Sequence, residues 1–263
     1  MIKLVASDLD GTLLPEGTKD INPEFYDVVR KLHEKGIIFV AASGRDLSTM
    51  RTVVEPIGDI IYCISNNGGR ITKYMDSDLA VYSLDFNLVQ DVISDTRNDE
   101  HVKFVSLSTN NGTYTDYKDK ETLDWLLNGY GMNPILVNDM SEKELSVVKI
   151  SVLTTCDATD VVEYYEKKYG EMCHVTVAGD RWIDFTHVKA DKGIAFLDLI
   201  NKLGISKMET WAFGDNINDI SMLESSGVGY AAPSAREEVK NVADVCLEGN
   251  IWDSVINQLK TLL

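Results

Sequence analysis

The amino-acid sequence predicts an α/β fold in which a doubly wound parallel sheet is interrupted by an inserted α+β domain. Apolar runs typical of buried parallel strands alternate with helical patterns near both ends of the 263-residue chain, as expected for βαβ units. Between these parts, hairpin signals break the alternation. We therefore expect residues 1–82 and 186–263 to form the core and residues 83–185 to form the inserted domain.

The first part of the chain shows a βαβαβ pattern. Proline is favoured at the first position of a helix and glycine just past its last position, and these two residues bracket the first helical pattern. The later apolar runs are continuous, as in strands buried on both faces. The predicted elements are strand 2–6, a helix from Pro23 to the stop at Gly36, strand 37–42, helix 47–55 and strand 60–64.

From about residue 67 the pattern changes, and it returns to βα alternation after Lys192. Asn-Gly pairs at 67–68 and 111–112 are hairpin signals. The expected middle elements are helices 88–96, 120–128 and 158–168 and strands 103–107, 147–153 and 174–177. The expected last elements are helices 193–203 and 219–225 and strands 210–213 and 228–230. Trp125, Tyr164 and Tyr165 lie on the middle helices and are expected in the core.

The composition limits the kind of partner. Lys and Arg number 25 against 42 Asp and Glu, which gives a formal net charge of −17 and argues against nucleic acid or an anionic membrane as a partner. An anionic substrate would need a local positive site, which a bound divalent cation can supply. No segment resembles a signal peptide or is long enough to span a bilayer, and the four cysteines are scattered. We therefore expect a cytoplasmic protein with reduced thiols in or near its core.

Asp8-Leu9-Asp10-Gly11-Thr12 directly follows the first predicted strand. Two carboxylates one residue apart at a strand end repel each other unless a cation or a proton separates them. This pattern indicates a metal site and acid–base chemistry. A surface turn is the alternative for this segment alone, because Asp and Gly are common turn residues.

Three further segments adjoin predicted core elements: Ser43-Gly44-Arg45, Lys192-Gly193 and the run from Gly214 to Asp219. Ligands of open parallel sheets bind beyond the carboxyl ends of the strands, so these segments should converge with the paired acids. Each has an ordinary explanation by itself, as a turn, a solvated lysine or a helix cap. Their joint occurrence favours one site.

With these four motifs in order, the chain resembles a haloacid dehalogenase (HAD) superfamily phosphatase of the Cof-type group. That group has a Rossmann-like core and a large α/β (type IIB) cap inserted after the second motif, so the resemblance covers essentially the whole chain. Asp-x-Asp-Gly-Thr joined to Gly-Asp-x-x-Asn-Asp is highly specific in combination. Ser43 stands where many relatives carry threonine, and either hydroxyl can donate to a phosphate oxygen.

The resemblance implies a role for each acidic residue. Asp8 is the expected nucleophile, which forms an aspartyl-phosphate that water then hydrolyses. Asp10 is the expected acid and base for the leaving group and the water. The expected cofactor is Mg²⁺, held by Asp8, the backbone carbonyl of Asp10, and Asp215.

The resemblance also implies a phosphate-binding set. Its expected members are Leu9 through its backbone amide, Ser43, Gly44, Arg45, Lys192 and Asn218. Lys192 also counts among the catalytic residues, because its charge would neutralise the nucleophile and the phosphoryl group. Asp219 is expected to orient Lys192 or water on the metal.

The sequence leaves three functions to compare. A phosphatase acting on small phosphomonoesters, such as sugar phosphates, is favoured, with a small phosphorylated metabolite as its partner. A phosphomutase of the capped type is the second, and a metabolite-binding regulator without catalysis is the third. The regulator is disfavoured because Asp8, Asp10, Lys192 and Asp215 are all present. The physiological substrate and the oligomeric state stay open.

Overall fold

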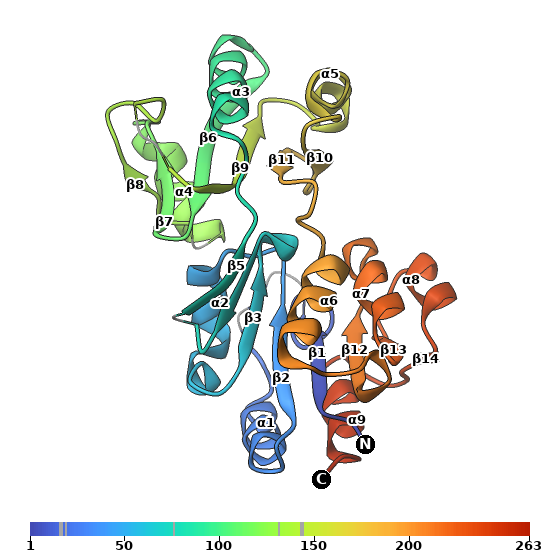
Figure 1. Cartoon of the computed structure of the whole chain (residues 1–263). Helices are drawn as coiled ribbons and strands as arrows, with labels where there is room; N and C mark the ends of the chain where they lie inside the picture. The colour runs from blue at the N-terminus through green and yellow to red at the C-terminus, as the bar shows by residue number, and fades with distance from the viewer. Residues whose placement is uncertain (16–17, 19, 76, 131, 143–144) are drawn as a thin grey trace. The chain divides into compact units, whose positions relative to one another are not determined.

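The computed structural model describes residues 1–263 except 16–17, 19, 76, 131 and 143–144. The chain divides into two compact units, whose residues can be followed in Figure 1 by the colour, which runs from blue at the N-terminus to red at the C-terminus. The core unit comprises residues 1–80 and 191–263, and the inserted unit comprises residues 81–190. The domain boundaries expected from the sequence, 82/83 and 185/186, lie two and five residues from these limits.

The core unit is built around an eight-stranded sheet with the order β14-β13-β12-β1-β2-β3-β4-β5. Its strands are β1 (Leu4–Asp8), β2 (Ile38–Ala42), β3 (Tyr62–Ser65), β4 (Arg70–Lys73), β5 (Ser77–Val81), β12 (Thr210–Gly214), β13 (Val228–Ala231) and β14 (Val245–Cys246). The six strands from β14 to β3 pair in parallel, and β4 pairs antiparallel to β3. The Asn-Gly hairpin at 67–68 therefore extends the core sheet.

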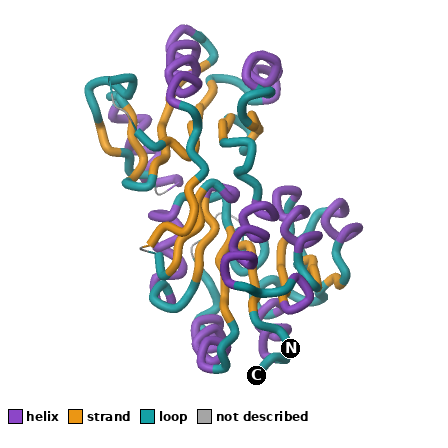
Figure 2. Tube along the Cα trace, viewed as in Figure 1, coloured by secondary structure: helices purple, strands orange, loops and turns teal. Residues whose placement is uncertain are grey.

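Helices cover both faces of this sheet, and Figure 2 distinguishes them from the strands by colour. One apolar cluster joins the sheet to α1 (Glu24–Glu34), α2 (Leu47–Val54) and α9 (Ser254–Lys260). A second cluster joins the opposite face to α6 (Lys192–Leu203), α7 (Ile220–Ser225) and α8 (Glu237–Val242). Short 3₁₀ turns occur at Glu55–Ile57, Asn66–Gly68, Lys207–Glu209 and Ile217–Asp219. The predicted doubly wound α/β core is thus confirmed.

The first helix shows how local sequence sets these elements. Phe25, Val28, Val29 and Leu32 are buried at helical spacing, so one face of α1 packs on the sheet. The helix begins after Pro23, where the side chain of Asn22 accepts the Glu24 N–H at 3.0 Å. It ends before Gly36, whose φ of 76° is left-handed and suits glycine.

The inserted unit is an α+β domain with a six-stranded sheet of order β10-β11-β9-β6-β7-β8. Its strands are β6 (Val102–Thr109), β7 (Gly112–Thr115), β8 (Ile135–Leu136), β9 (Val147–Thr154), β10 (His174–Val177) and β11 (Trp182–Thr186). The helices α3 (Phe86–Asn98) and α5 (Thr159–Tyr169) pack on one face of this sheet. A smaller apolar cluster includes Leu126 of α4 (Lys120–Tyr130). The predicted α+β character of the insertion is confirmed.

Three side chains differ from the burial that the sequence predicts. Trp125 and Tyr164 are 44% and 55% exposed, because they lie on the outer faces of their helices, whereas Tyr165 is buried as expected. Cys246 lies exposed on the short edge strand β14, so the expectation of core thiols is wrong for this residue. All four cysteines are free. Among the described residues, no helix has the length and apolar character that a membrane crossing requires.

The connectivity of the core sheet brings distant segments to one edge. After β1 the chain continues into β2 and β3 on one side, and it later adds β12, β13 and β14 on the other. In open α/β sheets, ligands bind at such a switch point beyond the carboxyl ends of the strands. The ends of β12, β1, β2 and β3 place Gly214, Asp8, Ala42 and Ser65 along this edge.

Candidate active site

Lys192 lies at the centre of a buried cluster of charges. It is the first residue of α6, and its Nζ donates to Asp8 Oδ1 at 2.7 Å and to Asp219 Oδ1 at 2.6 Å. The exposed fractions of Asp8, Lys192 and Asp219 are 4%, 1% and 0%, so little water reaches the pairs. Asp219 Oδ2 accepts the backbone N–H groups of Asp215 (3.0 Å) and Asn216 (3.1 Å), so both of its oxygens are used.

The cluster holds more negative than positive charge. Burial raises the pKa of Asp8 well above its usual range, and the nearby Asp219 carboxylate adds to this effect against the opposing charge of Lys192. Burial likewise raises the pKa of Asp215 to about 6. Although burial favours the neutral amine, Asp219 and Asp8 together raise the pKa of Lys192. Three carboxylates thus share a single ammonium, so that the ionised cluster lacks two balancing positive charges.

The donor set fits a divalent cation that prefers oxygen ligands. Carboxylate oxygens of Asp8, Asp215 and Asp219 lie within 4.8 Å of one another. Asp219 is already bonded to Lys192 and to two amides, but Asp8 Oδ2 is buried without a hydrogen-bond partner among the described residues. An orphaned buried carboxylate oxygen beside a second carboxylate is a site that Mg²⁺ could satisfy. The role of the Asp10 carbonyl in this site stays a prediction.

The loop after β1 fits closely around Asp215. Thr12 Oγ1 donates to Asp215 Oδ1 at 2.9 Å, which fixes the carboxylate. A Cβ atom at Gly11 would lie 2.2 Å from Asp215 Oδ2, and the φ of Gly11 is +85°. Glycine is therefore required here for two reasons, space and backbone conformation.

Asp10 and Arg45 form a pair beside the cluster. Arg45 Nε donates to Asp10 Oδ2 at 2.8 Å, and its Nη2 bonds to Asp10 Oδ1 and to the Thr18 carbonyl oxygen at 3.2 Å. The Asp10 side chain is thus held by the guanidinium. Arg45 thus neutralises the expected acid–base residue in this structure, and its contact with phosphate stays a prediction.

The expected phosphate-binding residues follow β2 and β12. Ser43 is buried directly after β2, and its Oγ accepts the Arg45 N–H at 3.1 Å. The exposed Asn218 donates through Nδ2 to Asn67 Oδ1 at 2.9 Å, and the same Asn67 oxygen lies 3.0 Å from where a Cβ of Gly44 would stand. The Leu9 side chain is buried in the core. The structure thus brings Ser43, Gly44 and Asn218 to the same edge, whereas their phosphate contacts stay predictions.

A family model described as haloacid dehalogenase-like hydrolase matches residues 5–259. The chain belongs to this family. The family and the enzyme class predicted from the motifs, a phosphomonoester hydrolase of the haloacid dehalogenase type, are thereby confirmed.

Several known proteins resemble this hydrolase along its whole length. The phosphatase YwpJ of Bacillus subtilis is 28% identical, with 100% of both chains covered. The 5-amino-6-(5-phospho-D-ribitylamino)uracil phosphatase YcsE of the same bacterium is 26% identical and covers 98% of this chain and 95% of its own. A crystal structure from Eubacterium rectale gives a TM-score of 0.92 at 28% identity, with 100% of this chain and 99% of the other covered.

Sequence reasoning missed three side chains that support the site of this hydrolase. Asp191 caps α6 by accepting the Ile194 N–H at 2.9 Å, and its other oxygen accepts the Ser221 hydroxyl at 2.8 Å, which ties α6 to α7. The capping pattern one residue before Lys192 was a usable signal. Asn67 was interpreted only as part of a hairpin turn, and its link to Asn218 depends on residues 151 positions apart.

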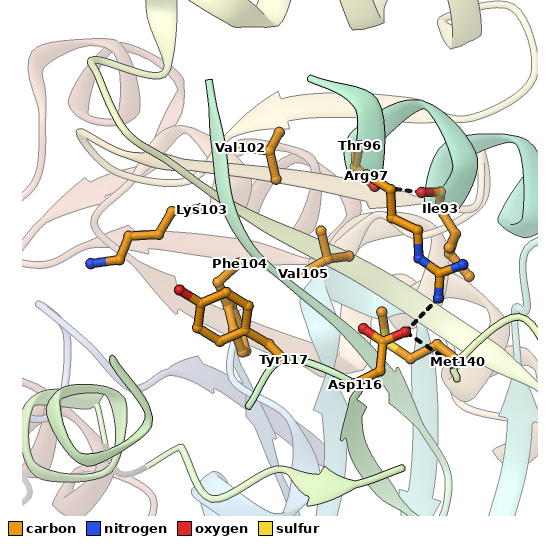
Figure 3. Close-up of a pocket in the computed structure, with 10 residues that line it drawn as sticks. All are labelled: Ile93, Thr96, Arg97, Val102, Lys103, Phe104, Val105, Asp116, Tyr117 and Met140. Carbon is orange, nitrogen blue, oxygen red and sulfur yellow. Dashed lines mark hydrogen bonds and ion pairs between the residues drawn. The ribbon is translucent and has the colours of Figure 1, made fainter. Parts of the chain in front are cut away.

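A separate cavity of about 190 Å³ lies within the inserted unit of the hydrolase, and Figure 3 shows its ten lining residues. Val102, Val105 and Met140 contribute to its apolar wall. Arg97, which also lines it, bonds to Asp116 and, at 2.6 Å, to Asp139. Two carboxylates therefore already neutralise this guanidinium.

Proposed function

We propose that this protein is a Mg²⁺-dependent phosphatase that hydrolyses small phosphomonoesters through an aspartyl-phosphate on Asp8. The observation that carries the proposal is the state of the Asp8 carboxylate. Its Oδ1 is held by Lys192 at 2.7 Å, while its Oδ2 is buried without a partner among the described residues. Lys192 thus orients the carboxylate through one oxygen and the other is left for a cation, an arrangement that can both hold and shield a nucleophile.

The proposed first step transfers the phosphoryl group to Asp8. An oxygen of Asp8 forms a bond to phosphorus as the bond from phosphorus to the ester oxygen breaks. Lys192 neutralises charge on the nucleophile and the phosphoryl group, and it is already desolvated, so its field acts at full strength. Ser43, the Gly44 amide, the Leu9 amide and Asn218 are proposed to bind the phosphoryl oxygens.

In the proposed second step, water attacks the aspartyl-phosphate and releases inorganic phosphate. The Asp10 carboxyl protonates the leaving ester oxygen in the first step and takes a proton from the water in the second. Arg45 keeps this side chain in place between steps through its two contacts. Bound Mg²⁺, held by Asp8, Asp215 and the Asp10 carbonyl, would shield the nucleophile from the charge of the phosphate.

We propose phosphorylated metabolites such as sugar phosphates as the substrates, with residues 83–185 acting as the cap that selects among them. The similarity to the phosphatase YwpJ and to YcsE, a 5-amino-6-(5-phospho-D-ribitylamino)uracil phosphatase, supports this proposal. The fold by itself does not decide the substrate. A screen of phosphorylated metabolites for phosphate release, ranked by kcat/KM, tests this part of the proposal.

The decisive experiment compares Asp8→Asn with Asp27→Asn, a matched change on the exposed face of α1. Asp8→Asn is expected to abolish phosphate release and the acid-stable label that ³²P-substrate leaves on the protein. Asp27→Asn is expected to keep both. Chelation with EDTA should stop hydrolysis, and added Mg²⁺ should restore it. Turnover by purified Asp8→Asn protein, or full activity in chelator, would contradict the proposal.

A further inference from the structure

The turn after β3 has an unusual backbone. Asn66 and Asn67 have φ values of 51° and 52°, and Gly68 follows with 97°, so three consecutive residues are left-handed. Residues other than glycine rarely adopt this conformation, although asparagine tolerates it best. Such conformations tend to persist at binding sites, where surrounding contacts hold them.

The surrounding contacts tie this turn to the segments of the candidate active site. The N–H groups of Asn66 and Asn67 donate to the carbonyl oxygens of Arg45 (2.9 Å) and Ser43 (3.0 Å). A Cβ at Gly68 would lie 2.3 Å from the backbone oxygen of Asp191, so the turn packs against the residue that precedes Lys192. The turn therefore touches both the segment after β2 and the start of α6.

The side chain of Asn67 completes this set of contacts. Its Oδ1 accepts the Asn218 Nδ2–H at 2.9 Å. A Cβ at Gly44 would lie 3.3 Å from its Nδ2, so the carboxamide lies directly against the backbone of Gly44. Within the described part of the chain, Asn67 Nδ2 has no hydrogen-bond acceptor, and the residue is only partly buried. The two N–H donors of Nδ2 thus lie beside Gly44 with no acceptor among the described residues.

We propose that Asn67 is a further substrate-binding residue, whose Nδ2 donates to an oxygen of the transferred phosphoryl group. This inference rests on the proposed phosphatase function. Asn67 Oδ1 also holds the Asn218 amide, so that the remaining N–H of Asn218 is available to the same group. This role would account for the left-handed turn. The turn places the Asn67 carboxamide at Gly44 while the backbone N–H groups of Asn66 and Asn67 stay bonded to the segment after β2.

Two substitutions separate a direct donor from a residue that only positions Asn218. Asn67→Gly keeps the left-handed backbone and removes the carboxamide. Asn67→Asp keeps an acceptor for Asn218 but replaces the two donors with a negatively charged oxygen. Asn257→Asp, at an exposed position of α9, is the control for the added charge. Thermal unfolding midpoints within a few degrees of wild type would show that the variants fold.

The readouts are kcat/KM for p-nitrophenyl phosphate and calorimetric binding of inorganic phosphate in the presence of Mg²⁺. A hydrogen bond to a charged group predicts a loss of about 10- to 100-fold in both readouts for Asn67→Gly. The loss for Asn67→Asp should be at least as large, and Asn257→Asp should match wild type. Asn67→Asp within about two-fold of wild type in phosphate affinity would overturn the proposal.

Failure of the phosphatase proposal is distinguishable from failure of this one. If wild type releases no phosphate from any ester but binds inorganic phosphate, the binding arm alone decides on Asn67. If wild type hydrolyses esters and Asn67→Gly retains full phosphate affinity, the phosphatase stands and the role of Asn67 is refuted. Absence of both hydrolysis and phosphate binding in wild type would overturn both proposals.

Discussion

Asp219→Ala is expected to destabilise the metal-free protein strongly. Asp219 is fully buried, and its carboxylate bonds to the Lys192 ammonium at 2.6 Å and to the backbone N–H groups of Asp215 and Asn216. Alanine removes all three interactions. Among the carboxylates of the described residues, only that of Asp8 then remains bonded to Lys192.

The magnitude follows from these contacts. Removing one partner of a buried ion pair costs about 3–5 kcal/mol, and a buried N–H group left without an acceptor costs about 1–3 kcal/mol more. Removing a negative charge opposes this loss, because Asp219 raises the pKa of both Asp8 and Asp215. We expect a net loss of about 3–5 kcal/mol in the free energy of unfolding. In a core unit of about 150 residues this corresponds to a Tm lower by roughly 10 °C.

Differential scanning calorimetry in chelator measures this shift. Asp219→Asn should also lose stability, because its carboxamide has one acceptor oxygen where the carboxylate uses two. Glu237→Gln is the control, since Glu237 lies 81% exposed in a surface pair and its change should move the Tm by no more than about 2 °C. A decrease in Tm of less than about 3 °C for Asp219→Ala would refute the view that Asp219 holds the buried lysine.

Three further outcomes test other parts of the structure. Gly193→Ala should lower the thermal unfolding midpoint, because the new Cβ would lie 2.4 Å from the α7 backbone. Gly129→Ala in α4 should raise the midpoint, because no atom lies within 4 Å of its Cβ position. Shifts of equal sign in the two variants would contradict this packing. Cys246→Ser should remove the fast phase of thiol labelling in the native protein, because Cys246 is exposed whereas burial raises the pKa of Cys63 to about 12. A fast phase that survives in this variant would contradict the assignment to Cys246. Burial, with a carboxylate neighbour, raises the pKa of Tyr169 above 10.0, so the unfolded chain releases its proton first and stability should fall as the pH rises above 10. A spectrophotometric titration of the native protein in which every tyrosine ionises near pH 10 would contradict the raised pKa of Tyr169.

Much of the secondary structure could be predicted because it depends on local patterns. The runs at 37–42 and 147–153 correspond to β2 and β9, and the spacing before Gly36 corresponds to α1. Helices α8 and α9 were not predicted. Helix α9 has only seven residues, and its apolar side chains become informative only once they pack against the cluster that includes α1.

The candidate site was likewise predictable from the sequence only in part. Convergence of Asp8, Lys192 and Asp219 could be expected, because each adjoins the carboxyl end of a parallel strand or the start of a helix at that edge. The pairing of Arg45 with Asp10 could not, because a long side chain can reach several partners and the sequence does not show which one it meets. The exposure of Trp125 was missed because helical spacing alone does not show which face of α4 packs inward.

The sequence by itself therefore determined the family, the α/β core with its α+β insertion, and the residue types of a phosphoryl-transfer site, since these depend on motifs and periodicity read along the chain. Only the tertiary structure decided which charges are buried, that Asp8 Oδ2 lacks a partner among the described residues, and that Asn67 lies between Gly44 and Asn218. Burial and hydrogen-bond geometry arise between residues far apart in sequence, so no local pattern carries them. That is why Asp8-Leu9-Asp10 indicated a site, whereas the fold showed how its carboxylates differ.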